Sequence, residues 1–115
     1  MSLDFYLYFG ENNEETEEER GYVFDRNITH NINKMATEAG IYKVLWHPEE
    51  NGFNKAKQII SILEKGLKDM KERPEHYEQF NAPNGWGSYE HFVPWVEDVL
   101  KACKRYPEAS IETST

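Results

Sequence analysis

The chain has 115 residues, the size of one ordinary domain, and its formal net charge is −8 at pH 7. A net anion is repelled by nucleic-acid phosphates and by anionic membrane surfaces, so the charge argues against direct binding to either. No segment approaches the roughly 20 apolar residues that a membrane span needs, and the single cysteine, Cys103, cannot form an intrachain disulfide. These features predict one soluble, cytoplasmic domain, residues 1–115.

The chain opens with a pattern typical of a β-hairpin. Residues 3–9 alternate, and their bulky apolar side chains fall on one face. A second strand is expected at residues 22–26, after Gly21. Between the strands, residues 11–20 hold six glutamates. Because such dense like charges repel one another, this segment is expected to be a mobile, solvated loop.

Helical spacing begins after the hairpin. Thr29 is the expected N-cap of a short helix that ends at Gly40, where a left-handed residue commonly closes a helix. Residues 41–46 are apolar and β-prone, and they predict a short strand or an extended packed segment. The clearest helix is expected at residues 54–72, with Asn54 as its N-cap.

The last third of the chain predicts a loop, a helix and a strand. Residues 74–88 are rich in turn formers, and Ser88 is a suitable N-cap for a helix over 89–105. Pro94 predicts a kink in that helix, or a short turn with the helix proper starting near Val93. The alternating segment 109–114 predicts a final strand.

Together these elements predict an α+β domain. The C-terminal strand is expected to join the N-terminal hairpin, because an isolated two-stranded hairpin is only marginally stable. This small antiparallel sheet would pack on about three helices. The two long helices are expected to pack on each other through matched apolar stripes: Ile59, Ile60, Leu63 and Leu67 against Trp95, Val96, Val99 and Leu100.

Four polar side chains mark the first candidate binding segment. They are Asn27, Thr29, His30 and Asn31, at the expected strand-to-helix junction. A helix N-terminus offers unpaired N–H groups and a positive dipole end, which suit an anion. The commoner alternative is that Asn27 and Thr29 only cap the helix and complete a turn.

A second candidate segment surrounds Trp86, which lies between two glycines and is followed by Tyr89 and His91. The permissive backbone could present the indole flat against a planar ligand, where stacking is worth about 1–3 kcal/mol. Alternatively, Trp86 folds back into the core, as large aromatic side chains often do. We expect His30 and Trp86 to share one binding surface.

Signatures of catalysis and metal binding are weak. The four histidines share no metal-ligand spacing with one another or with Cys103, which lies on an apolar helical face and is expected to be buried and inert. No glycine-rich phosphate loop is present, and no pattern singles out an acid/base pair. The sequence therefore predicts no catalytic residue, no metal and no cofactor.

Several runs resemble a small family of uncharacterised phage and prophage proteins. The resemblance covers most of the chain apart from residues 11–19. It rests on Val23-Phe24-Asp25, Asn27-Ile28-Thr29-His30-Asn31, Gly40-Ile41, Asn84-Gly85-Trp86-Gly87-Ser88-Tyr89, Phe92, Pro94 and the ending Pro107 to Ser114. It implies a phage-encoded accessory protein in the host cytoplasm, of a size class that often counters host defence. It supplies no site residues.

Two functional hypotheses follow. The leading one is a non-catalytic protein that sequesters a small anionic, planar, nucleotide-like ligand between the segments around Asn27–Asn31 and Trp86–His91. The alternative is an acidic protein-interaction inhibitor whose glutamate-rich loop mimics nucleic acid and blocks a basic host complex. The identity of the ligand or partner and the oligomeric state stay open.

Overall fold

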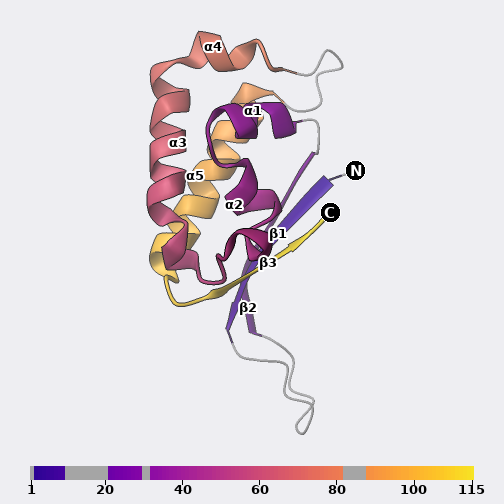
Figure 1. Cartoon of the computed structure of the whole chain (residues 1–115), viewed down its shortest axis with the longest axis vertical. Helices are drawn as coiled ribbons and strands as arrows, with labels where there is room; N and C mark the ends of the chain where they lie inside the picture. The colour runs from indigo at the N-terminus through magenta and orange to yellow at the C-terminus, as the bar shows by residue number, and fades with distance from the viewer. Residues whose placement is uncertain (1, 10–20, 30–31, 82–87) are drawn as a thin grey trace, which may run out of the picture.

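The central strand, β1 (Ser2–Phe9), shows why the chain forms a sheet with one covered face. Its side chains alternate, so Leu3, Phe5 and Leu7 are fully buried while Tyr6 between them is half-buried. The computed structural model describes residues 2–9, 21–29, 32–81 and 88–115. Within these residues, helices cover one face of a three-stranded antiparallel sheet (Figure 1).

The other two strands flank β1 in the order β2-β1-β3. Strand β2 (Gly21–Thr29) pairs antiparallel with β1, and an irregularity in the register falls between Leu7 and Tyr8. Strand β3 (Ser110–Ser114) pairs antiparallel with the opposite edge of β1. This arrangement confirms the predicted α+β domain, in which the C-terminal strand joins the N-terminal hairpin.

Two long helices form the bulk of the helical layer. Helix α3 (Ile60–Glu72) and helix α5 (Tyr89–Arg105) run alongside each other in opposite directions (Figure 1). Shorter elements complete the layer: α1 (Asn33–Glu38), α2 (Tyr42–Trp46), α4 (Pro74–Glu78) and the 3₁₀ turns η2 (Glu49–Asn51) and η3 (Ala56–Gln58). None of the helices within the described ranges is long and apolar enough to cross a membrane.

The apolar stripes of the two long helices lie in one core, as predicted. Leu63 on α3 and Val99 on α5 are fully buried, and Ile60 is half-buried at the margin of the core. The edge of the Phe5 ring meets Trp95, with 6.4 Å between ring centroids. Cys103 is buried as expected, and burial raises the pKa of its thiol to about 12.

The segment 41–46 is helical, so the predicted strand is wrong. Helix α2 buries Val44, Leu45 and Trp46, and Ile41 just before it is also buried. Positions 41, 44 and 45 repeat with the period of a helix, so one helical face contributes to the core. This tertiary packing overrides the β propensity of the individual residues.

Two predicted N-caps are also wrong. Thr29 is the last residue of β2, and α1 begins after Ile32 without a side-chain cap. The expected helix 54–72 is divided into η3 and α3, with Ile59 at the N-cap of α3. The Gln58 side chain explains the break, because its Oε1 accepts the backbone N–H groups of residues 54 and 55.

Two prolines lie within helices of the described residues. Pro74 does not open a loop but occupies the first turn of α4, where its missing N–H costs nothing. Pro94 lies inside α5, which spans Tyr89–Arg105 as predicted; of the two alternatives for Pro94, the start near Val93 is wrong. By contrast, Gly40 follows α1 with φ +77°, which confirms the predicted left-handed residue there.

Gly66 permits a close approach between α3 and the turn that joins α1 to α2. A Cβ added at position 66 would clash with the Ile41 side chain and come within 2.9 Å of the Ala39 carbonyl oxygen. A glycine inside a helix normally costs about 1 kcal/mol relative to alanine. Here the steric requirement outweighs that cost.

We expect Gly66→Ala to lower the free energy of unfolding by about 1–3 kcal/mol, because overpacking exceeds the gain in helix propensity. Urea denaturation measures the change. Ser61→Ala, at an exposed position of the same helix, is the control and should alter stability by no more than about 0.5 kcal/mol. A more stable Gly66→Ala protein would show that this approach does not constrain α3.

Truncating Leu63 tests the interface between the two long helices. Leu63 is fully buried, so Leu63→Ala should cost about 2–5 kcal/mol through lost burial and the cavity left behind. The measurement is again equilibrium unfolding. A loss well under about 1 kcal/mol would mean that the space collapses and that Leu63 contributes little to the core.

Candidate functional site

The face of the sheet that points away from the helices is the most distinctive surface of the described residues. We call it the outer face. All its members are exposed or half-buried. The alternation along β1 and the registers of β2 and β3 assign to it Asp4, Tyr6, Tyr8, Tyr22, Asp25, Asn27, Ser110, Glu112 and Ser114.

Tyrosine rings connect the strands across this face. The Tyr22 ring lies 5.5 Å from the Tyr6 ring and 5.7 Å from the Tyr8 ring, measured between centroids. The Tyr22 hydroxyl reaches over β1 and donates a hydrogen bond of 2.9 Å to Glu112 Oε2 on β3. Tyr22 is nevertheless 49% exposed. The outer face therefore presents aromatic surface held in place by cross-strand contacts.

Carboxylates surround these rings. Burial raises the pKa of the Tyr6 hydroxyl above its ordinary value, and nearby negative charges raise it further. Those charges are Asp4 on β1, Asp25 on β2 and Glu112 on β3. Each strand thus contributes one acidic group and no lysine or arginine to this face, while Lys55, which pairs with Ser110, brings a positive charge to its β3 edge.

The first predicted binding segment belongs in part to this face. The side chain of Asn27 donates hydrogen bonds to Asp4 Oδ1 at 2.7 Å and to Ser2 Oγ at 3.0 Å. Thr29 pairs with Ser2 at the end of the same strand. Both residues therefore lie in a strand, not at a helix N-terminus. His30 and Asn31 lie outside the described residues.

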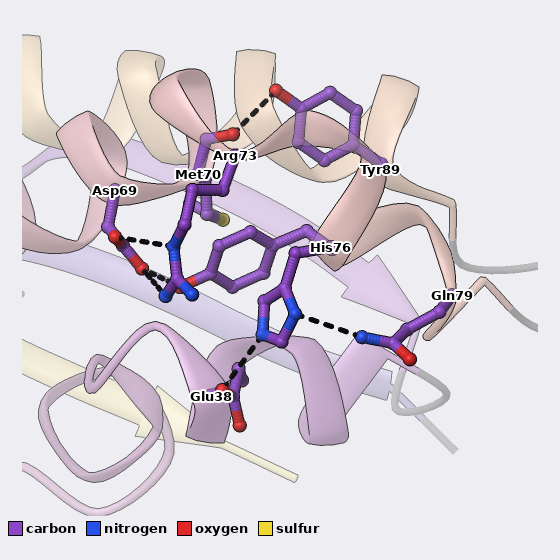
Figure 2. Close-up of polar contacts among 8 residues, drawn as sticks. Glu38, Asp69, Met70, Arg73, His76, Gln79 and Tyr89 are labelled. Atoms are coloured by element: carbon purple, nitrogen blue, oxygen red, sulfur yellow. Dashed lines mark hydrogen bonds and ion pairs between the residues drawn. The ribbon is translucent and has the colours of Figure 1, made fainter.

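The second predicted segment lies at the start of α5. The Tyr89 hydroxyl donates to the Met70 carbonyl oxygen at 2.9 Å (Figure 2), and its backbone N–H donates to Asn81 Oδ1 at 2.7 Å. Tyr89 thereby attaches α5 to the end of α3. His91 is exposed, with its Nδ1 2.8 Å from Ser88 Oγ. Trp86 lies outside the described residues, and so does its predicted proximity to His30.

A second polar cluster joins α3 to α4 (Figure 2). Arg73 donates two hydrogen bonds to the carboxylate of Asp69, at 3.0 Å from Nε and 2.6 Å from a terminal nitrogen. The Tyr77 hydroxyl donates to the same carboxylate. The bonds from Arg73, and then that from Tyr77, lower the pKa of Asp69 to about 2.

His76 extends this cluster to α1. Its Nε2 lies 2.9 Å from the Glu38 carboxylate, and its Nδ1 lies 3.0 Å from the Gln79 side chain (Figure 2). Burial, and then the bond to Asp69, raises the pKa of Tyr77 to about 12. With Asp69 charged and Tyr77 neutral near pH 7, neither group is poised for proton transfer. The cluster is therefore best explained as a clasp that holds α4 against α3 and α1.

The outer face and the clasp are absent from the sequence predictions for different reasons. Asp69 and Arg73 lie four residues apart, and this spacing by itself indicates an ion pair on one helix face. The outer face requires the register of three strands, and Tyr22 and Glu112 are 90 positions apart. No sequence spacing reveals that contact.

Neither a metal site among the described residues nor a known relative identifies a functional residue. Across residues 2–9, 21–29, 32–81 and 88–115, no group of three or more His, Cys, Asp or Glu side chains is placed to hold a metal ion. Comparisons with family models, curated proteins and solved structures found no match to this chain. No functional residue is therefore carried over from another protein.

The clasp predicts a specific acid sensitivity. The pKa of Asp69 is about 2 in the fold against an ordinary value of 3.8, so its contribution to stability is complete above pH 3.8 and is lost as the pH falls through 2. We expect Asp69→Asn to flatten the decline of the unfolding free energy in that window, as measured by urea titration at several pH values.

Tyr77→Phe is the matched comparison, because it removes one hydrogen bond to Asp69 but keeps the pair with Arg73. It should give an intermediate pH profile. Parallel profiles for wild type and Asp69→Asn would show that the fold does not stabilise the ionised carboxylate.

Proposed function

We propose that this protein is a non-catalytic interaction module that binds a basic partner protein through its outer face. The observation that carries the proposal is the combination of three tyrosines and three carboxylates on a sheet face that helices leave uncovered. Positive side chains of a partner would find complementary charge there, next to aromatic surface.

The tyrosines supply the contact area. A tyrosine buries a large ring at low entropic cost and keeps a polar hydroxyl for hydrogen bonding, which explains its enrichment in protein interfaces. Contacts with Tyr6, Tyr8 and Glu112 already restrict Tyr22 in the free protein. This preorganisation lowers the entropy that binding must overcome.

Charge supplies the orientation and the encounter rate. The whole chain carries a net charge of −8, and this total includes six glutamates in the segment that joins β1 and β2 in the sequence. Such a field steers a cationic partner toward the protein and repels acidic competitors. A basic nucleic-acid-binding protein of a host cell fits this description, in keeping with the predicted phage origin and counter-defence role.

A nucleotide-like ligand at Asn27, Thr29, His30, Asn31, Trp86, Tyr89 and His91 receives less support from the described residues. The Asn27 amide already donates to the carboxylate of Asp4, which would repel an anion. The Tyr89 hydroxyl is engaged by the Met70 carbonyl. An acidic surface that receives cations agrees better with these contacts.

Calorimetric titration with a short peptide of alternating glycine and arginine tests the proposal. We expect Asp25→Asn to weaken binding about threefold, and Tyr22→Ala to weaken it about tenfold. Asp25 is exposed, so its change should leave the melting temperature almost unaltered. Tyr22→Ala also loses cross-strand contacts, so binding is measured well below the melting temperature of that variant. Binding should also weaken at high salt.

The matched control is Glu75→Gln, an equal loss of charge at an exposed position of α4, away from the sheet (Figure 1). It should leave the affinity unchanged. If Glu75→Gln and Asp25→Asn weaken binding equally, attraction depends on net charge alone and the outer face is not the site.

A further inference from the structure

A pocket opens beside β3, between this strand and residues 48–55. We call it the β3 pocket, and its volume is about 460 Å³. The lining residues that matter here are Tyr8, Pro48, Glu49, Phe53, Lys55 and Glu112. Tyr8 and Glu112 also belong to the outer face, so the pocket continues that surface around the edge of the sheet.

Backbone contacts hold the two walls of the pocket in place. The N–H of Ile111 donates to the Asn54 carbonyl oxygen at 3.1 Å. The N–H of Ala56 donates to the Ala109 carbonyl oxygen at 2.9 Å. On the other side of the opening, Gly52 has φ +82°, and Phe53 N–H donates to the Pro48 carbonyl oxygen at 2.8 Å. The turn at Gly52 thus brings Phe53 back to Pro48, and both residues line the pocket.

The lining combines aromatic and acidic groups. Tyr8 and Phe53 are half-buried rings, and Pro48 beside them is buried. Glu49 and Glu112 contribute two negative charges against the one positive charge of Lys55. The Lys55 ammonium donates to Ser110 Oγ at 3.2 Å. The pocket therefore has a net negative lining that includes two aromatic rings.

We propose that the β3 pocket binds an arginine side chain of the basic partner, an inference that rests on the proposed function of the outer face. A guanidinium group is planar, stacks on aromatic rings and donates paired hydrogen bonds to carboxylates. Its aliphatic stem covers apolar surface such as the Phe53 ring. An anionic ligand is disfavoured, because two carboxylates oppose the single lysine.

Lys55 places a positive charge in the lining of the β3 pocket. A cation that enters the pocket meets the positive charge of Lys55, so removing that charge should strengthen binding. Lys55→Met keeps most of the aliphatic side chain and should raise the affinity for the glycine–arginine peptide about threefold. Glu49→Gln removes a carboxylate at an exposed position and should lower the affinity about fivefold.

The probes are the glycine–arginine peptide and its counterpart with citrulline, which has the same shape but no charge. Calorimetry on the full chain should show binding of the first and none of the second. Changes of opposite sign for Lys55→Met and Glu49→Gln support the pocket. Asp25 and Tyr22 are absent from the pocket lining, so the two pairs of variants change different residues and can be compared in one titration series.

The variants separate the two proposals. If Asp25→Asn and Tyr22→Ala weaken binding while Glu49→Gln and Lys55→Met do nothing, the outer face binds the peptide and the pocket inference is wrong. The reverse pattern retains the pocket as an arginine site and rejects the outer face. Failure of the arginine peptide to bind, or equal binding of the citrulline peptide, rejects both.

Discussion

The packing of β1 against the helical layer is the constraint on which the rest of the structure depends. Leu3, Phe5 and Leu7 are fully buried, and the Phe5 ring contacts Trp95 on α5. Because side chains alternate along a strand, a register slip of one residue would move tyrosines into the core and leucines into water. Burial of one side of β1 therefore determines which residues form its opposite side.

The outer face is a consequence of this one-sided burial. With helices on a single face, the other face of β1 and its partners on β2 and β3 stay accessible (Figure 1). Tyr6, Tyr22 and Glu112 meet there although they come from three separate strands. A rigid sheet thus presents aromatic and acidic groups at constant spacing, which suits recognition of a partner surface.

The short helices of the domain depend on specific contacts with α3. Gly66 lets the turn around Ala39 lie directly on α3, and the Asp69–Arg73–Tyr77 clasp holds α4 to α3. Such contacts replace helix propensity, because helices of five or six residues are not stable alone. The hydrogen bonds from Arg73 and Tyr77 that attach α4 to α3 account for the lowered pKa of Asp69, so this shift does not indicate a catalytic group.

The sequence by itself determined the α+β class, the strands at both ends and the two long helices, because strong alternation and helical periodicity report directly on which face is buried. Only the tertiary structure decided that residues 42–46 form α2, since packing of Ile41, Val44 and Leu45 overrides their β propensity, and that Thr29 ends a strand. Cross-strand neighbours such as Tyr22 and Glu112 depend on sheet register, and register arises only when the whole core is assembled.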